Sequence, residues 1–327
     1  MSAHSQLGRE VLRDVSRSFY LSLRLLPKDF REPTSVGYLL ARLSDTIADS
    51  GSGSERLEVL NELKLSVEKK SAAEGLNGRL QELAKYPGVS QGEKVLLQRG
   101  AEVFNWLKCL SARREEEVRR VVGIIVEGQS WDLTRFEGEG VTRLSNKEEL
   151  ENYTYQVAGC VGEFWTRVGF LYSDRFAGAS QEMMEKFGRS YGQGLQLVNI
   201  LRDLPEDLER GRCYLPGSGQ PSPEELMKDR GVWLDRADAL LDEGLDYCDQ
   251  VSGLRVGVAT GLPVLLGKLT LAKLRKASWE ELVSRVKVSR SEVKRAGWCA
   301  LKESGRWGHH APRWRKMCAS YLKNADS

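Results

Sequence analysis

The sequence predicts an all-α protein. Apolar residues recur at steps of three and four along nearly the whole chain, the period of a helix with one buried face. No segment shows the alternating pattern of a half-buried strand, and no glycine-rich turn of a βαβ unit is present. Together these observations favour helices packed round a central cavity.

Turn residues divide the chain into its predicted helices. The breaks SGSGS, AKYPGVSQG, GEGVTRLS and LPGSGQPSP are rich in Gly, Pro and Ser. None is long enough for a flexible linker, and no repeat is apparent, so we expect a single domain over residues 1–327, with its core at about 8–300. In chain order, helices are expected at 5–26, 34–49, 54–72, 76–86, 91–110, 113–137, 146–172, 180–208, 223–250, 254–276 and 289–302.

Individual residues indicate where two helices begin and where another group can pack closely against a helix. Ser145, with Glu148 three residues on, resembles a capping box. Ser222 offers an N-cap, and a proline follows it at the first helical position. Within 146–172, Gly159 and Gly162 allow a neighbouring helix or a ligand to approach closely.

Composition narrows the classes of function. A net charge of +3 on 327 residues gives no reason to expect nucleic-acid binding. The six cysteines lie far apart without metal-binding spacing, which indicates reduced core residues in a cytoplasmic protein. The three histidines lie near the chain ends, which argues against a zinc site or a Ser-His-Asp triad.

Membrane insertion is not expected from the sequence. The start MSAHSQLGRE is not a signal peptide, and the apolar stretch at 256–267 is too short to span and is interpreted as a buried core helix. Basic residues become more frequent towards the C-terminus. They are interpreted as a solvated surface, or as a surface with weak attraction for an anionic membrane or a phosphorylated cofactor. We expect a monomer or weak dimer, peripheral to the inner face of the membrane.

Two acidic pairs carry most of the functional information. Asp45 and Asp49, and likewise Asp203 and Asp207, are spaced i,i+4, which stacks two carboxylates on one helix face. Apolar neighbours indicate that both helices are buried, where carboxylates are costly unless cations or metal accompany them. The polar residues that extend the two stripes are Tyr38, Arg42, Gln196 and Asn199. Hard oxygen ligands beside Arg and amide groups suit Mg²⁺ held with substrate phosphates.

Four motifs resemble the squalene/phytoene synthase family, whose members join two prenyl diphosphates head to head. They are SRSFYLSLRLLP (16–27), YLLARLSDTIAD (38–49), YTYQVAGCVGEFW (153–165) and QLVNILRDLPEDLERGRCYLP (196–216), and they cover most of the chain in order. The resemblance implies an isoprenoid synthase fold, one large helical bundle around a deep cavity. It also implies that two aspartate motifs hold Mg²⁺, or Mn²⁺, against prenyl diphosphate substrates.

The resemblance assigns roles to individual residues. The metal ligands are Asp45, Asp49, Asn199, Asp203 and Asp207, with the four aspartates counted as catalytic. Tyr153 is a catalytic residue beside the reacting carbons. The substrate-binding residues are Ser18, Phe19, Tyr38, Arg42, Val157, Ala158, Gly159, Gln196, Asn199 and Arg202.

The product expected from the sequence is squalene, made from two farnesyl diphosphates through presqualene diphosphate. The segment VSRVKVSRSEV (283–293) resembles a basic stretch that contacts NADPH, which makes Lys287 and Arg290 cofactor candidates. Dehydrosqualene, phytoene and presqualene diphosphate synthases remain alternatives. So does a non-enzymatic helical adaptor, whereas a chain-elongating synthase or terpene cyclase typically has a denser DDxxD motif.

Pro205 separates the second acidic pair. It removes one helical N–H and disfavours helix at the preceding residue, so we expect the helix to bend or end between Asp203 and Asp207.

Overall fold

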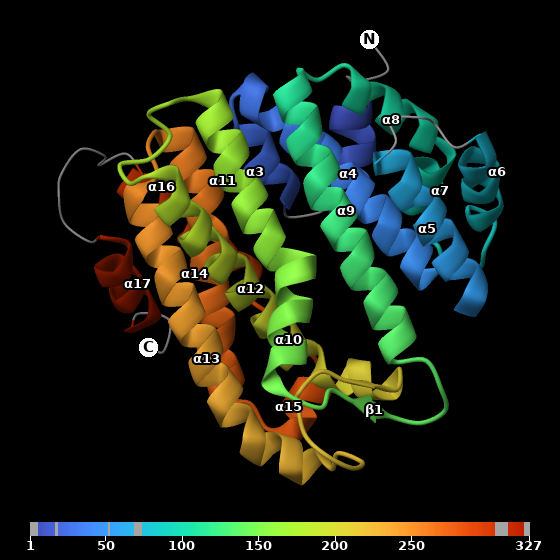
Figure 1. Cartoon of the computed structure of the whole chain (residues 1–327). Coiled ribbons are helices and arrows are strands. Elements are labelled where there is room, and N and C mark those ends of the chain that lie inside the picture. The colour runs from blue at the N-terminus through green and yellow to red at the C-terminus, as the bar shows by residue number, and fades with distance from the viewer. Residues whose placement is uncertain (1–5, 17–18, 52, 69–73, 305–312, 324–327) are drawn as a thin grey trace. The chain divides into compact units, whose positions relative to one another are not determined.

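The computed structural model describes residues 6–16, 19–51, 53–68, 74–304 and 313–323, and these are almost entirely helical (Figure 1). The chain divides into two compact units. Unit 1 comprises residues 1–137 and 167–172, and unit 2 comprises 138–166 and 173–327. The all-α prediction is confirmed. The single domain and its central cavity stay predictions, and each unit is described below by itself.

Unit 1 is built around the long helices α4 and α9. Leu39, Leu40 and Leu43 of α4 are fully buried, and α4 packs against α9, which also packs against α5. Burial of these apolar faces stabilises the helices, since propensity alone rarely does. The elements are η1 (Leu7–Val11), α2 (Leu12–Ser16), α3 (Phe19–Leu25), α4 (Lys28–Asp49), α5 (Gly53–Glu68), α6 (Glu74–Leu83), α7 (Gln91–Gln98), α8 (Gly100–Lys108) and α9 (Ala112–Arg135).

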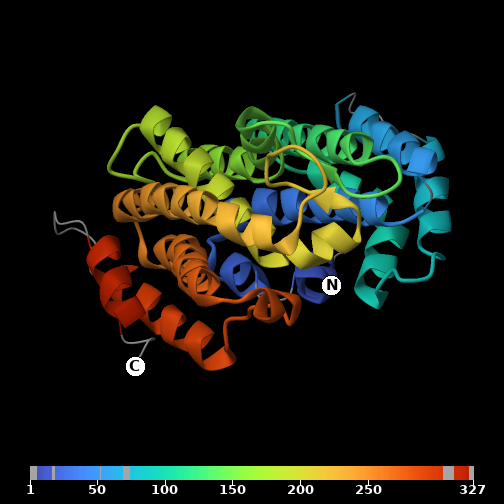
Figure 2. The same cartoon turned by 90° about the horizontal axis from the view of Figure 1, so that it is seen from below.

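Unit 2 is centred on three long helices, α12, α13 and α14, which pack against one another (Figures 1 and 2). The short helix α17 packs against α13, α14 and α16. The elements are β1 (Thr142–Arg143), α10 (Lys147–Thr154), η2 (Tyr155–Gly159), α11 (Cys160–Tyr172), α12 (Gln181–Glu209), β2 (Arg212–Cys213), α13 (Pro223–Gln250), α14 (Leu254–Lys276), α15 (Trp279–Val283), α16 (Arg290–Ser304) and α17 (Trp314–Lys323). The last six residues of α11 belong to unit 1.

Glycines let α12 touch both α11 and η2 through their backbones. A Cβ added to Gly162 would lie 1.8 Å from the carbonyl oxygen of Gly188, and one added to Gly192 would lie 2.2 Å from that of Ala158. No side chain fits at such distances. The close approach predicted from Gly162 is therefore confirmed, and the approaching group is a helix.

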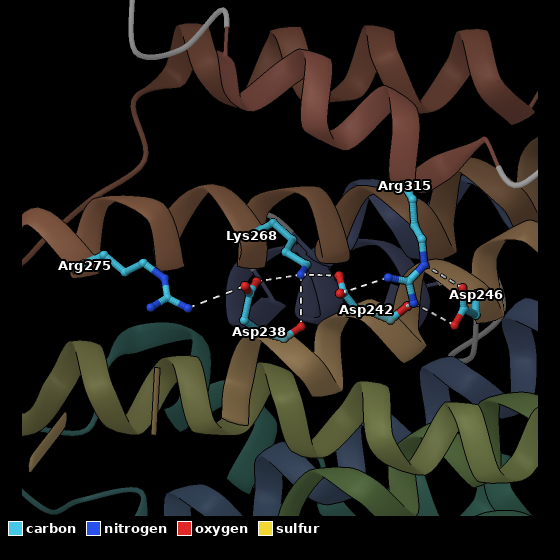
Figure 3. Close-up of polar contacts among 6 residues, drawn as sticks. All are labelled: Asp238, Asp242, Asp246, Lys268, Arg275 and Arg315. Carbon is cyan, nitrogen blue, oxygen red and sulfur yellow. Dashed lines mark hydrogen bonds and ion pairs between the residues drawn. The ribbon is translucent and has the colours of Figure 1, made fainter. Parts of the chain in front are cut away.

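A row of charges joins α13 to its neighbours in unit 2. Lys268 of α14 is only 7% exposed and bonds Asp238, with Nζ 2.6 Å from Oδ1, and also Asp242. Arg315 of α17 bonds Asp242 at 2.9 Å and Asp246 at 2.8 Å. Because the aspartates lie at four-residue steps, one face of α13 ties down both neighbouring helices (Figure 3).

The strands β1 and β2 form a short parallel pair, with Thr142 opposite Arg212. Arg143 of β1, 3% exposed in its side chain, donates from Nε to the carbonyl of Leu215 at 2.8 Å and pairs with Glu225 at 2.6 Å. This guanidinium holds the loop after β2 against the start of α13. The pairing is too short to give the alternating pattern of a strand.

Several predicted boundaries are wrong. The single helix expected at 5–26 consists of η1, α2 and α3, and the one at 91–110 breaks at Arg99. The N-cap of α10 is Asn146 and not Ser145, since its side chain accepts from the N–H of Glu149 at 2.9 Å. The Ser222 cap is confirmed.

The helix α14 is long and apolar enough to cross a membrane by length and composition, but 72% of its most apolar window is buried inside the protein. The segment 256–267 is thus the buried core helix that the sequence predicts.

The start of α16 provides a pH-dependent contact. Glu292 accepts from the Ser289 N–H at 2.6 Å and from Lys273 Nζ at 2.8 Å. Burial favours the neutral acid, yet these bonds outweigh it and lower the pKa of Glu292 to about 2.

A depressed pKa contributes stability above the unfolded value, which is lost as pH falls from about 4.5 towards 2. We expect Glu292→Gln to lower the free energy of unfolding by about 2 kcal/mol at neutral pH, and by much less near about pH 3. Urea unfolding at both pH values checks this, with the exposed Glu116→Gln as control. Equal losses at the two pH values would contradict it.

Candidate active site

The first acidic pair lies on α4 in unit 1. Tyr38, Arg42, Asp45 and Asp49 share one side of the helix, opposite the fully buried leucines. Asp45 and Asp49 are exposed, so the helix is buried through its apolar face and not through its carboxylates. The Tyr38 hydroxyl donates to the carbonyl of Val15 at 3.2 Å, which orients the ring.

Arg42 lies between two carboxylates. Its guanidinium bonds Asp45 at 3.2 Å and also contacts Glu93 of α7. Glu93 is fixed in turn by the capping box of α7, where its Oε2 accepts from the Ser90 N–H at 2.9 Å. Burial opposes ionisation of Glu93, but the bonds from Ser90 and Arg42 hold its pKa below the usual value. Arg42 is therefore held in place with its charge towards Asp45.

The positive charge around Asp45 does not offset the cost of burying its ionised carboxylate. Its Oδ1 accepts from Gln129 Nε2 at 2.7 Å, and Arg42 is its ion-pair partner. Desolvation by the surrounding protein nevertheless raises the pKa of Asp45 to about 6, and the neighbouring Asp49 adds to the shift. The side chain is still 51% exposed, so protein atoms crowd the carboxylate without sealing it from solvent. A further cation would stabilise its ionised form.

The second acidic pair lies on α12 in unit 2. Gln196, Asn199, Asp203 and Asp207 are all half-buried, and Asn199 Nδ2 donates to Gln196 Oε1 at 3.4 Å. Arg202 binds Asp203 through two contacts, at 2.9 Å and 2.5 Å. This hydrogen bonding raises the pKa of Arg202.

The break expected at Pro205 does not occur. The helix α12 continues to Glu209, so Asp203 and Asp207 remain on one helix at i,i+4 spacing. Pro205 is buried, and its neighbours Leu201 and Leu204 are buried with it. Tertiary packing thus outweighs the loss of one backbone hydrogen bond.

Arg285 is a site residue that the sequence does not reveal. It lies between α15 and α16 with a φ of 64°, a left-handed conformation that is uncommon outside glycine. Its guanidinium lies 3.4 Å from Asp203 Oδ1 and 3.7 Å from Glu206 Oε2. A second arginine therefore lies against the second acidic motif. Only the basic character of VSRVKVSRSEV pointed towards this segment.

Tyr153, which is predicted to lie beside the reacting carbons, is 9% exposed and stacks on Tyr214, with ring centroids 4.8 Å apart and an angle of 14°. The two hydroxyls lie 3.4 Å apart. Tyr214 belongs to the quoted CYLP sequence, but nothing local indicated this contact.

Val157, Ala158 and Gly159, which are predicted to bind substrate, lie in η2, a π-helical turn. Such turns occur frequently at functional sites. Gly159 is buried against Gln193 and Arg189 of α12, since an added Cβ would lie 3.0 Å and 3.3 Å from their atoms. Its role in substrate binding stays a prediction.

The structure says less about the predicted cofactor-binding residues and about Ser18 and Phe19. Lys287 and Arg290 are exposed, and the carbonyl of Lys287 accepts from Lys273 Nζ at 3.2 Å. Phe19 begins α3, whereas Ser18 lies outside the described residues.

The donor sets of both units fit Mg²⁺. Over the described part of the chain, no three His, Cys, Asp or Glu side chains cluster as a metal site. Mg²⁺ usually binds through one or two carboxylates, together with substrate phosphates and water. Each aspartate pair can supply the carboxylates. Near the first pair, Arg42 Nε and Gln129 Oε1 are buried without a hydrogen-bond partner. Unpaired donor and acceptor atoms beside an under-compensated carboxylate match a site built for additional polar groups.

Comparison with known proteins identifies the fold and the family. The fold matches a solved structure of TcSQS with the ligand BPH1237, with a TM-score of 0.74 over 99% of each chain at 17% identity. A presqualene diphosphate synthase of Zymomonas mobilis is 29% identical over 71% of this chain and 64% of its own length. A phytoene synthase of Thermus thermophilus is 30% identical over 84% of each protein.

The fold is therefore the all-α fold of the isoprenoid synthases. Squalene/phytoene synthase sequences match residues 12–292, and the chain belongs to the squalene/phytoene synthase family. This family consists of prenyl-transferring enzymes that condense prenyl diphosphates head to head.

Proposed function

We propose that this protein condenses two farnesyl diphosphates to presqualene diphosphate and reduces that intermediate to squalene. The observation that carries the proposal is made on the helices α4 and α12, each of which bears two aspartates at i,i+4 spacing with an arginine bonded to the first of them. Carboxylates that bind a divalent cation, together with arginines that bind phosphate oxygens, are what a diphosphate leaving group requires.

Asp45 and Asp49 would hold Mg²⁺ in one unit, and Asp203, Asp207 and Asn199 would hold it in the other. When bound, Mg²⁺ or Mn²⁺ neutralises the charge that develops on the departing diphosphate. Arg42 and Arg202 already contact these carboxylates, at 3.2 Å and 2.5 Å, so each can add hydrogen bonds to a phosphate oxygen beside the metal.

The first condensation forms a cyclopropane between the two prenyl chains, releases one diphosphate and loses one proton. Tyr153 and Tyr214 offer a buried aromatic pair with hydroxyl groups, suited to stabilising a carbocation and handling a proton. In the second half-reaction the other diphosphate leaves, the resulting carbocation rearranges with opening of the cyclopropane ring, and a hydride adds to the rearranged cation. The exposed Lys287 and Arg290 would bind the phosphate of NADPH, which would supply that hydride when bound.

The second candidate is presqualene diphosphate synthesis without reduction. It is favoured by the 29% identity to the Zymomonas mobilis enzyme. The two reactions share the first condensation and differ in the need for NADPH.

Incubating the pure protein with farnesyl diphosphate and Mg²⁺, with and without NADPH, separates these reactions. Squalene that forms only with NADPH supports the proposal. Presqualene diphosphate accumulating under both conditions selects the second candidate. Dehydrosqualene, or a C40 product from geranylgeranyl diphosphate, would overturn both.

A helical adaptor without activity is tested by thermal unfolding with Mg²⁺ and diphosphate. Ligands that bind the folded state alone raise stability by RT ln(1 + [L]/Kd), about 2.7 kcal/mol at one hundred times Kd. We expect a rise in Tm that needs both components. No rise, together with no product, would favour the adaptor.

A further inference from the structure

One face of α16 in unit 2 is exposed and has an unusual composition. Trp298 is 73% exposed and Leu301 is 42% exposed, and Trp298 is the only tryptophan classed as exposed within the described ranges. Lys294, Arg295 and Lys302 are exposed on the same helix. We call these five residues the α16 stripe.

Helical spacing places the stripe on a single surface. Lys294 lies four residues before Trp298 and Lys302 lies four after it, so the three stack along one side of the helix. The opposite side contains the buried Ala296, Ala300 and Ser304, and α16 packs there against α14. The aromatic side chain therefore has cations on both sides and faces away from the core.

The acidic residues of α16 do not lie on this surface. Glu292 is turned to Lys273, 2.8 Å away, and Glu303 is also half-buried. Arg295 lies 6.0 Å from the centre of the buried Tyr321 ring, so its aliphatic part covers α17. Within α16 itself, the residues on the exposed side are therefore basic or uncharged.

We propose that the α16 stripe binds the surface of an anionic phospholipid bilayer. An indole is apolar with one polar N–H, and such side chains concentrate at the membrane interface. Lys and Arg extend their apolar stems along the surface while their charges reach the phosphates. Because the stripe is a convex helix face, it fits a broad negative surface. Binding by one such face is reversible and salt-dependent.

The proposal is tested with the full-length protein and two kinds of vesicle, phosphatidylcholine alone and phosphatidylcholine with phosphatidylglycerol. We expect cosedimentation with the anionic vesicles that weakens at high salt. Replacing Lys294 and Lys302 together by Gln should weaken binding by about 25-fold, about fivefold for each charge. Trp298→Ser should weaken binding and reduce quenching of protein fluorescence by brominated lipid.

A matched control lies on α13. Val232 is 70% exposed and Lys228 is exposed nearby, so Val232→Ser and Lys228→Gln change the same kinds of residue elsewhere. Both control variants should bind as the original protein does.

Equal binding to neutral and anionic vesicles would overturn the proposal, as would unchanged binding of the stripe variants. A dimer that Trp298→Ser converts to monomer in sedimentation would show that a second copy occupies this face. Vesicle binding is measured without substrate, and turnover separately in detergent. Failure of this proposal is thus distinguishable from failure of the enzymatic one.

Discussion

Replacing Asp45 or Asp203 by asparagine is expected to lower the turnover of farnesyl diphosphate on the order of 10³-fold while the protein stays folded. Either change removes a carboxylate charge from a proposed metal-binding pair. At Asp45 it also removes repulsion with Asp49 and the burial cost that raises the pKa of the carboxyl to about 6. The Asp45→Asn protein should therefore be as stable as the original, or slightly more so, whereas Asp203→Asn weakens the ion pairs with Arg202 and Arg285.

Steady-state turnover with saturating Mg²⁺ measures the first effect, and thermal unfolding measures the second. Asp174→Asn, an exposed change outside the helices, serves as a control that should keep its activity. Full activity in both Asp45→Asn and Asp203→Asn would refute the assignment of metal ligands. A lowered Tm in Asp45→Asn would contradict the expectation that this carboxylate destabilises the folded protein.

Gly162→Ala is expected to cost about 3 kcal/mol of stability, at the upper end of overpacking effects. The new methyl group would lie 1.8 Å from the carbonyl oxygen of Gly188. The obstacle is backbone on α12, so no rotamer change relieves the clash. Separating α11 from α12 would also disturb the helix that carries Asp203.

Chemical unfolding of Gly162→Ala beside Gly123→Ala checks this expectation. Gly123 lies within α9 with no atom within 4 Å of an added Cβ. Alanine there should raise stability by about 0.5–1 kcal/mol, because it favours the helix. If both variants are equally stable, the close contact between the helices is not as described.

The helical period predicted the long helices well because each buries a continuous apolar face. Along α12 and α13 the same spacing repeats over many turns, and their predicted bounds agree with the structure to within one residue. Short helices such as α15 and α17 hold too few turns for the period to appear. The π-helical turn η2 carries no distinct pattern in the sequence.

In the candidate site, too, contacts within one helix could be predicted from the sequence and contacts between helices could not. Residues that lie on one helix, such as Arg42 with Asp45, could be grouped from their spacing. Gln129 and Glu93 come from helices far away in sequence, so their contacts with Asp45 and Arg42 follow only from tertiary packing. Arg285 depends on an unusual backbone angle that no neighbouring residue announces.

The attachment of α17 has a practical consequence for anyone who shortens or tags this chain. The Trp314 ring fills the notch at Gly261, where an added Cβ would lie 1.9 Å from the indole, and Asp249 accepts from its backbone N–H at 3.1 Å. Truncation before Trp314 would expose Gly261 and remove the Arg315 guanidinium that pairs with Asp242 and Asp246. A purification tag should therefore be placed after Lys323, where it leaves the packing of α17 intact.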